Sequence, residues 1–291
     1  MVYIPKNCMK SLKPILLSAS LLLMTAVSSA QELSDSTPNS YFKFSVSWLS
    51  NSVYFGRKDS LPVPYIIPSL SYHDKSGFFI EGSLSYLATQ QGQIDAGDLT
   101  AGYDFHSKDQ NFSGELYATK YFVSNSSYSV KGEVKAALGT YLDYNTGPVT
   151  FNGGADLAFS GKTDIALSLG ISHAFELGAD KHFAITPSAL LNAGTENFYS
   201  SYFTNRKFSS ARRRRVVTSN SVVVIQKSFA ILDYELSLPL NYDNSKWGLF
   251  ITPIYSIPQN PFMYSLNGGV TYRTEVLSNT FYAEAGAYIK F

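Results

Sequence analysis

The stretch TDIALSLGISHAF, Thr163 to Phe175, alternates apolar side chains with polar or small ones at a period of two residues. In a β-strand, successive side chains point to opposite faces of the sheet. The apolar face of this stretch would carry Ile165, Leu167, Leu169, Ile171 and Phe175, and the opposite face Asp164, Ala166, Ser168, Gly170, Ser172 and Ala174. The pattern therefore predicts a strand with one apolar and one polar face.

The same period recurs along nearly the whole chain after residue 40, where helical periodicity is almost absent. GFFIEGSLSYL (77–87), VKGEVKAALGTYL (130–142) and the terminal FYAEAGAYIKF (281–291) all repeat it. We predict about twelve strands, at 41–55, 62–73, 77–89, 94–106, 111–123, 128–142, 147–159, 162–176, 181–199, 221–241, 246–257 and 279–291. The stretch 262–275 fits either a loop or a hairpin arm above the sheet.

The connections between these strands fall into two classes that alternate along the chain. Short, turn-like connections are expected at 73–76, 106–110, 145–147, 177–182 and 242–246, and more variable ones at 56–61, 90–93, 124–127, 160–161, 200–220 and 258–278. An even strand count with short turns at one end and longer loops at the other is typical of a transmembrane β-barrel. Its apolar face meets lipid, and closure removes the unpaired edges that a bilayer does not tolerate.

The competing interpretation is a soluble β-sandwich or a lipocalin-like barrel, which would bury the apolar face. A soluble barrel of eight strands would need fewer residues than this alternating region contains. The preferred fold class is therefore all-β: a single antiparallel, up-and-down transmembrane β-barrel of about 12 strands that occupies 41–291. Three prolines, Pro68, Pro187 and Pro253, conflict locally with this pattern and suggest bends or bulges near one rim.

The first thirty residues have the features of a secretory signal peptide. Lys6, Lys10 and Lys13 precede an apolar run, 14–27, that is shorter than the ~20 residues a membrane-spanning helix needs. The alternative is an uncleaved anchor. Residues 31–40 would then form a short periplasmic leader. Because Cys8 is the only cysteine, the mature chain is expected to contain no disulfide and no thiolate metal site.

Cleavage at this site removes three lysines and leaves 20 basic and 22 acidic residues, a formal net charge of −2. No basic field attracts nucleic acid, so nucleic-acid partners are not expected. The histidines His73, His106 and His182 fall in or beside separate turns. Neither a metal site nor a cofactor site is therefore predicted.

The C-terminal strand carries the most specific resemblance. Its terminal Phe291 and the alternating Ile289, Ala287 and Ala285 resemble the assembly signal of bacterial outer-membrane β-barrel proteins, although the two alanines are smaller than usual. The resemblance implies an outer-membrane location and recognition of this strand by the barrel-assembly machinery. The Tyr- and Ser-rich strands look most like small barrels of Bacteroidota.

Charged residues on the polar faces are the first candidates for function, because charged rings select solutes in channels. The candidates for the lumen are Glu81, Asp98, Glu115, Lys131, Glu133, Lys135, Asp156, Glu235 and Glu284. The alternative is a salt-bridge network that fills a narrow barrel, since buried charges are tolerated only when they are paired.

A second candidate site is the arginine run Arg212, Arg213, Arg214 and Arg215, which falls in the longest predicted extracellular loop. Arginine forks match phosphate well, so the run could bind lipopolysaccharide or another anionic ligand. The alternative is a solvated loop without a ligand.

Two functions remain open at this stage. One is a passive pore or small-solute transporter with a charged lumen. The other is a structural or interaction barrel with a filled interior, whose extracellular loops contact lipopolysaccharide or a partner. We expect no enzymatic activity, because no nucleophile–base constellation is visible. The sequence leaves the oligomeric state open.

Overall fold

The computed structural model describes residues 39–58, 62–88, 92–124, 127, 129–203, 223–225, 229–265 and 270–291. The expected signal peptide lies outside the described residues, as does nearly all of the predicted leader. The arginine run Arg212–Arg215 also lies outside them, so its proposed role stays a prediction.

Strands make up most of the described chain. The 12 strands that form the closed wall are β1 (Tyr41–Leu49), β4 (Tyr65–His73), β5 (Phe78–Leu87), β6 (Gln93–His106), β7 (Phe112–Val123), β8 (Ala136–Asn145), β9 (Thr150–Phe159), β10 (Thr163–Ser172), β13 (Ser188–Gly194), β15 (Ala230–Ser237), β17 (Trp247–Pro258) and β20 (Thr280–Lys290). Three short strands continue the wall toward the short-turn end: β11 (Phe175–Leu177), β12 (Phe183–Ile185) and β16 (Leu240–Asn244).

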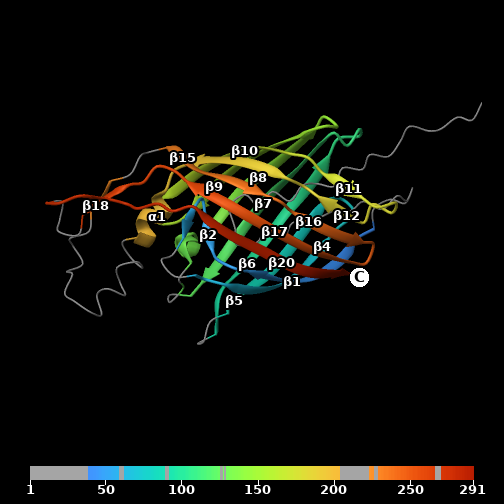
Figure 1. Cartoon of the computed structure of the whole chain (residues 1–291). Coiled ribbons are helices and arrows are strands. Elements are labelled where there is room, and N and C mark those ends of the chain that lie inside the picture. Colours follow the sequence, from blue (N-terminus) through green and yellow to red (C-terminus); the bar gives the residue numbers. More distant parts are fainter. Residues whose placement is uncertain are drawn as a thin grey trace, which may run out of the picture.

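The wall closes where the last strand meets the first. β20 pairs antiparallel with both β1 and β17, and every other wall strand pairs antiparallel with its two neighbours. At the seam, the N–H of Phe42 donates to the carbonyl of Phe291 (2.8 Å), and the N–H of Phe291 donates to the carbonyl of Phe42 (3.0 Å). The prediction of an up-and-down barrel that closes through its C-terminal strand is confirmed. Figure 1 shows the C-terminus at the short-turn end and α1 and β18 at the opposite end.

The remaining elements lie toward the long-loop end. They are the hairpin strands β2 (Val53–Tyr54) and β3 (Arg57–Lys58), the 3-10 helix η1 (Val130–Glu133), the helix α1 (Asn197–Tyr202), and the strands β14 (Val223–Ile225), β18 (Met263–Ser265) and β19 (Arg273–Thr274). The last three form a separate sheet, so 262–275 is the hairpin arm rather than a loop. Within the described residues, no helix has the length and apolar character to span a membrane.

Several predicted strands were too long at the long-loop end. The segment 41–55 ends as a wall strand at Leu49, and Val53–Tyr54 form β2 of a separate hairpin. The segment 128–142 becomes a strand only at Ala136, because 130–133 form η1 with Val130 and Lys131 buried inside. The segment 181–199 ends as a strand at Gly194, and α1 follows it. In each of these three segments an alternating sequence leaves the sheet at the long-loop end to fold into the barrel mouth.

Side-chain direction in the wall is the reverse of that in a soluble barrel. On β1, the outward residues Phe42, Phe44, Val46 and Trp48 are exposed, while the inward residues Lys43, Ser45 and Ser47 are buried. The same alternation runs around the ring, with exposed Leu, Ile and Phe outside and buried Ser, Thr, Asp and Glu inside. A closed sheet with an apolar exterior and a polar interior is stable only when lipid surrounds it. The protein is an outer-membrane β-barrel.

Cross-strand glycine–aromatic pairs fill the inner face near the seam. Gly248 lies directly opposite Tyr288, and Gly286 directly opposite Phe250. A Cβ added to Gly248 would lie 2.5 Å from the Tyr288 ring, and one added to Gly286 would lie 2.6 Å from the Phe250 ring. The ring of each partner therefore occupies the place of the missing side chain, which is a known way to pin strand register.

The three prolines lie at irregularities of the sheet, as predicted, but Pro68 and Pro253 stand in the middle of β4 and β17 rather than near one rim. Pro187 stands in the break between β12 and β13, and Pro253 faces the break between β15 and β16. Pro68 lies where pairing between β4 and β5 is interrupted, since the register runs from Ile66 directly to Ser69. Each proline thus sits where one ladder hydrogen bond is already missing.

Candidate functional site: the barrel lumen and its plug

Three loop segments fold back into the long-loop mouth and form what we call the plug: the hairpin Val53–Lys58, η1 and α1. The hairpin turns through Phe55 and Gly56, whose φ angles are 49° and 71°. Two successive positive φ angles define the tight turn that matches strand twist. Gly56 also approaches the wall closely, because a Cβ there would lie 2.8 Å from the Cβ of Pro258.

The plug has an aromatic core. The ring of Phe198 lies 4.6 Å from that of Tyr54, and the ring of Phe262 lies 5.3 Å from Tyr199 and 5.0 Å from Phe203. All five side chains are at most 3% exposed. Aromatic side chains bury the largest apolar area per residue, so this cluster is the main apolar contribution to the stability of the plug.

Arg57 fastens the hairpin to the rest of the mouth and is 1% exposed. Its Nε donates to Oε1 of Glu196 (2.8 Å), and its Nη2 lies 2.6 Å from the same oxygen. Nη2 also donates to the carbonyls of Gln259 (2.9 Å) and Asn260 (3.1 Å). Glu275 lies 3.9 Å from Nη1. A buried guanidinium held by one close carboxylate and two carbonyls is a strong and geometrically specific contact.

α1 is attached to the wall through Asp164 on β10. The backbone N–H groups of Asn197 and Phe198 donate to the two oxygens of this carboxylate (2.7 and 2.8 Å), and the Thr195 hydroxyl donates to Oδ1 (2.6 Å). A carboxylate at this place satisfies N–H groups that have no partner inside the helix. Asp164 therefore positions α1 inside the mouth.

η1 is the third element of the plug, and Lys131 ties it to the wall. The Lys131 Nζ donates to the hydroxyl of Tyr121 (2.9 Å) and lies 5.3 Å from the centre of the Tyr54 ring. Just before η1, the Ser129 hydroxyl lies 3.2 Å from that of Ser52, next to the hairpin. The hairpin, η1 and the wall are thus joined into one buried network.

Burial shifts the pKa values of two charged residues at the plug, Lys131 within η1 and Glu196 directly before α1, and neither residue lies on a strand. Burial raises the pKa of Glu196 to about 7, and the Arg57 guanidinium opposes this shift. Burial lowers the pKa of Lys131 to about 7, and Asp98 opposes this shift. Both groups therefore depend on their partners to stay charged at neutral pH.

Beneath the plug, carboxylates on the wall are buried and hydrogen-bonded. Asp233 accepts from Asn192 and Ser256, each at 2.8 Å, and Glu235 accepts from the Tyr282 hydroxyl at 3.1 Å. These two acids are at most 3% exposed. Polar groups of the barrel itself therefore fill this part of the lumen.

A different environment surrounds the inward acids of β6, β7 and β9. Asp104, Glu115 and Asp156 are only half-buried. Asp104 lies directly opposite Glu115 across β6 and β7, and Asp156 accepts a hydrogen bond from Tyr117. Like charges that lie directly opposite are normally unfavourable in a sheet. This side of the lumen is thus both more accessible to solvent and acidic.

The structure places most of the predicted lumen residues inside. Glu81, Asp98, Glu235 and Glu284 are inward and buried, while Glu115 and Asp156 are inward and half-buried. The three charges of 131–135 do not lie on a strand face. Lys131 is buried and Glu133 half-buried on η1, and Lys135 is exposed at the rim just before β8. The interpretation of these three as one face of a strand was wrong, because the chain enters the mouth here.

The sequence did not identify Arg57 and Glu196 as partners. Arg57 fell at the start of a predicted loop, and Glu196 near the end of a predicted strand. Their separation of 139 residues leaves no local signal for the contact. The one available signal was the loss of alternation in FGRK, 55–58, directly after a regular strand.

The sequence matches no family model and no curated protein sequence. Among solved structures, the chain is similar to the "KdgM porin", with 11% identity, 87% of this chain and 99% of that chain covered, and a TM-score of 0.46. The "NanC porin" is 10% identical, with 86% of this chain and 100% of that chain covered and a TM-score of 0.47. The COG4313 outer membrane channel from Pseudomonas putida F1 is 9% identical, with 88% of this chain and 97% of that chain covered and a TM-score of 0.47. Because about nine in ten aligned residues differ, function has to be inferred from the lumen and the plug themselves.

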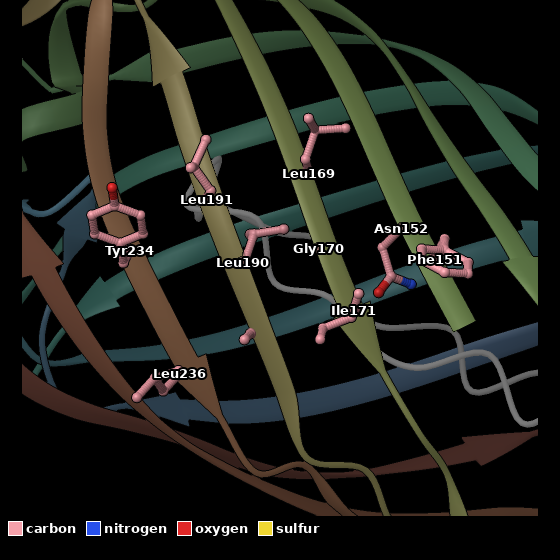
Figure 2. Close-up of a pocket in the computed structure, with 10 residues that line it drawn as sticks. Phe151, Asn152, Leu169, Gly170, Ile171, Leu190, Leu191, Tyr234 and Leu236 are labelled. Carbon is pink, nitrogen blue, oxygen red and sulfur yellow. The ribbon is translucent and has the colours of Figure 1, made fainter. Parts of the chain in front are cut away.

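A groove of about 510 Å³ lies on the outer face over β9, β10, β13 and β15. Figure 2 shows Leu169, Leu191 and Leu236 among the side chains that border it. Two of these, Leu169 and Leu236, are exposed on the lipid-facing side. The groove therefore belongs to the lipid-facing surface and not to the lumen.

Among the described residues, no cluster of His, Cys, Asp or Glu has the makeup of a metal site.

Proposed function

We propose that the protein is a passive channel for small solutes, non-enzymatic, whose lumen is closed at its extracellular mouth by the plug. The observation that carries this proposal is the construction of the plug. It is made of loop segments that are separate from the wall, and a buried ion pair, Arg57–Glu196, holds its hairpin in place. A closure built from loops can move while the wall stays paired.

The solutes of this channel are cationic or neutral rather than anionic. Among the described residues, the half-buried charged groups that β6, β7 and β9 direct into the lumen, Asp104, Glu115 and Asp156, are all acids. The half-buried inward cation Lys290 lies on β20, where its Nζ is 3.9 Å from the Asp243 carboxylate. Rings or strips of carboxylates favour cations in channels. We therefore expect a cation preference whenever the plug is displaced.

Conductance in planar lipid bilayers tests the proposal. The wild-type barrel is expected to be closed most of the time, and Arg57→Met is expected to raise the open fraction about tenfold or more, since a broken buried ion pair destabilises the plug strongly. A wild-type barrel that is permanently open would contradict closure by the plug.

A reversible lock provides the matched control. The hydroxyls of Ser52 and Ser129 lie 3.2 Å apart, and the sequence has no cysteine other than Cys8. In Ser52→Cys/Ser129→Cys, oxidation should abolish openings and reduction should restore them. In the open state, Glu115→Gln should reduce cation preference, whereas Glu284→Gln, a buried acid, should change it less.

The second candidate function is a structural or interaction barrel with a filled interior. It is favoured by the burial of Asp233 and Glu235 inside the lumen. It predicts that Arg57→Met stays silent even when hydrogen exchange shows the plug to be open. In that case the extracellular loops, including the arginine run Arg212–Arg215, become the place to seek lipopolysaccharide or a partner.

A further inference from the structure

Several inward-facing glycines of the wall lie opposite aromatic side chains that occupy the space beside them. A Cβ added to Gly102 would clash with the ring of Phe79, which lies directly opposite on β5. A Cβ added to Gly139 would clash with the ring of Tyr117, which lies directly opposite on β7. Each ring therefore fills the place that the glycine leaves.

Gly154 also lies opposite an aromatic residue, but the space beside it stays open. Its direct partner on β8 is Tyr141. The atoms nearest to a Cβ added to Gly154 belong to Ser168 and to the backbone of Thr140, and the closest of them is 3.5 Å away. A methyl-sized group thus fits here without a clash, and we call this place the Gly154 notch.

Tyr141 presents carbon rather than its hydroxyl to the lumen. Tyr141 and Gly154 are both half-buried, whereas the hydroxyl oxygen of Tyr141 is buried. The accessible part of this side chain is therefore its ring. An aromatic ring beside an open notch is suited to apolar groups and to cations, since the face of the ring is electrostatically negative.

Two carboxylates flank the notch. Glu115 lies directly opposite Tyr141 on β7. Asp156 lies two residues beyond Gly154 on the same face of β9, and it accepts a hydrogen bond from Tyr117. Alternate residues of a strand are about 6.8 Å apart, so the Asp156 carboxylate is within reach of a group in the notch. Both acids are half-buried, and the surroundings of the notch are therefore negatively charged.

The lumen already holds one ammonium group with a ring and carboxylates. The Nζ of Lys131, on η1 of the plug, lies 4.3 Å from the centre of the Tyr121 ring. This ammonium group also interacts electrostatically with Asp98 and Asp156. Displacement of the plug removes the lysine from Asp156, which then faces a solute in the lumen.

We propose that Tyr141 and the Gly154 notch form a binding site for small alkylammonium cations, whose charge is met by Glu115 and Asp156. The alkyl groups lie in the notch against the Tyr141 ring, where a cation within about 6 Å of the ring centre is attracted. The site rests on the proposed channel function, since it names the class of cation that the lumen selects.

Binding of choline to the folded wild-type barrel in detergent, measured by isothermal titration calorimetry, tests the site. The site is half-buried with the plug in place, so the wild type is suitable. Choline should bind more tightly than its uncharged isostere, in which carbon replaces the quaternary nitrogen. Tyr141→Leu should weaken choline binding about tenfold, and Tyr141→Phe should leave it nearly unchanged because the ring is kept.

Further variants separate the notch from the charge. Gly154→Val fills the notch and should weaken choline binding as Tyr141→Leu does, so it keeps the test open should Tyr141→Leu fold poorly. Glu115→Gln should weaken choline binding and leave the isostere unaffected. The matched control is Glu284→Gln, which removes a buried acid elsewhere in the lumen and should leave choline binding unchanged.

Two results would overturn the site: an unchanged choline affinity in both Tyr141→Leu and Gly154→Val, or equally tight binding of the uncharged isostere. Recordings in planar bilayers keep the site separate from the channel function. Ring-dependent choline binding by a barrel that never conducts upholds the site and contradicts the channel. A cation-selective channel whose choline affinity does not depend on Tyr141 upholds the channel and contradicts the site.

Discussion

The barrel wall and the plug place their apolar side chains in opposite ways. In the wall, Leu169 is 67% exposed and points to lipid, while Ser168 beside it is buried. In the plug, Tyr54 and Phe198 are buried against each other. The wall is arranged for a membrane solvent, and the plug is a small protein core held inside the barrel.

The two regions also differ in what stabilises them. The wall strands are joined by an almost continuous ladder of backbone hydrogen bonds around a closed ring. The plug has few backbone bonds to the wall and depends on side chains, chiefly Arg57, Asp164 and Lys131. Because side chains hold the plug and backbone hydrogen bonds hold the wall, a single side-chain substitution should release the plug while the wall stays folded.

The largest expected effect comes from Arg57→Met. This change leaves Glu196 buried without its guanidinium partner and should lower the free energy of opening the plug by about 3–5 kcal/mol. Burial already raises the pKa of Glu196 above its usual 4.5 to about 7 while Arg57 opposes the shift. Loss of Arg57 raises this pKa further, so the destabilisation should be greater at pH 8 than at pH 5.

Hydrogen exchange followed by mass spectrometry measures this effect. Peptides that cover 53–58 and 197–202 should exchange faster in Arg57→Met, and those from β5 to β7 should not. The double variant Arg57→Met/Glu196→Leu should recover part of the loss, because it removes the stranded carboxylate as well. Equal acceleration in the wall would show that the plug and the wall open as one unit.

The next effect concerns the wall. Leu169→Arg puts a charge in the middle of β10 on the lipid-facing side and should cost about 2–4 kcal/mol of folding stability. Leu177→Arg, at the periplasmic end of the same run of strands, should cost about 0–1 kcal/mol because it lies near the interface. Urea unfolding in lipid vesicles measures both. Similar losses of folding stability at the two positions would contradict a bilayer whose midplane lies near Leu169 and whose interface lies near Leu177.

The sequence was sufficient for the wall because every wall strand obeys one local rule. Alternation at Ile165, Leu167 and Leu169 is readable without knowing any partner strand, and the closure followed from an even strand count and an apolar last strand. The lumen acids Glu81, Asp98 and Glu235 followed from the same rule, since inward and outward positions alternate.

The plug could not be predicted in this way. Its contacts join segments far apart in the chain, as with Arg57 and Glu196, and no periodicity marks them. Around Lys131 the alternation is present but misleading, because Val130 and Val134 are buried in the mouth instead of facing lipid. An alternating pattern defines two faces, and only tertiary contacts decide whether the second face meets lipid or a plug.

The smallest expected effect belongs to neither region but to an exposed periplasmic turn. The Asp74 carboxylate accepts from the N–H of Ser76 (2.9 Å) and from the hydroxyls of Ser40 (2.9 Å) and Tyr72 (3.2 Å). Hydrogen bonds from Ser76, then from Ser40, lower the pKa of Asp74 below its usual range. The contribution of this turn to stability is therefore present above pH ~4, the value in an unfolded chain, and is lost as the pH falls toward the folded value.

NMR of the folded barrel in micelles can follow the Ser76 amide signal between pH 7 and pH 3. We expect the signal to stay constant down to pH ~4 in the wild type, because the folded carboxylate keeps its charge there. Asp74→Asn should remove any change of the Ser76 amide signal below pH ~4, and it should leave the wall and the plug folded. The turn at Asp109, whose pKa is lowered in the same direction by Ser107, is an internal replicate. If the Ser76 amide signal instead changes with a midpoint near pH ~4, the Asp74 carboxylate titrates as in an unfolded chain. The hydrogen bonds of this turn would then be absent in solution, and the ordered structure of the wall would end at His73.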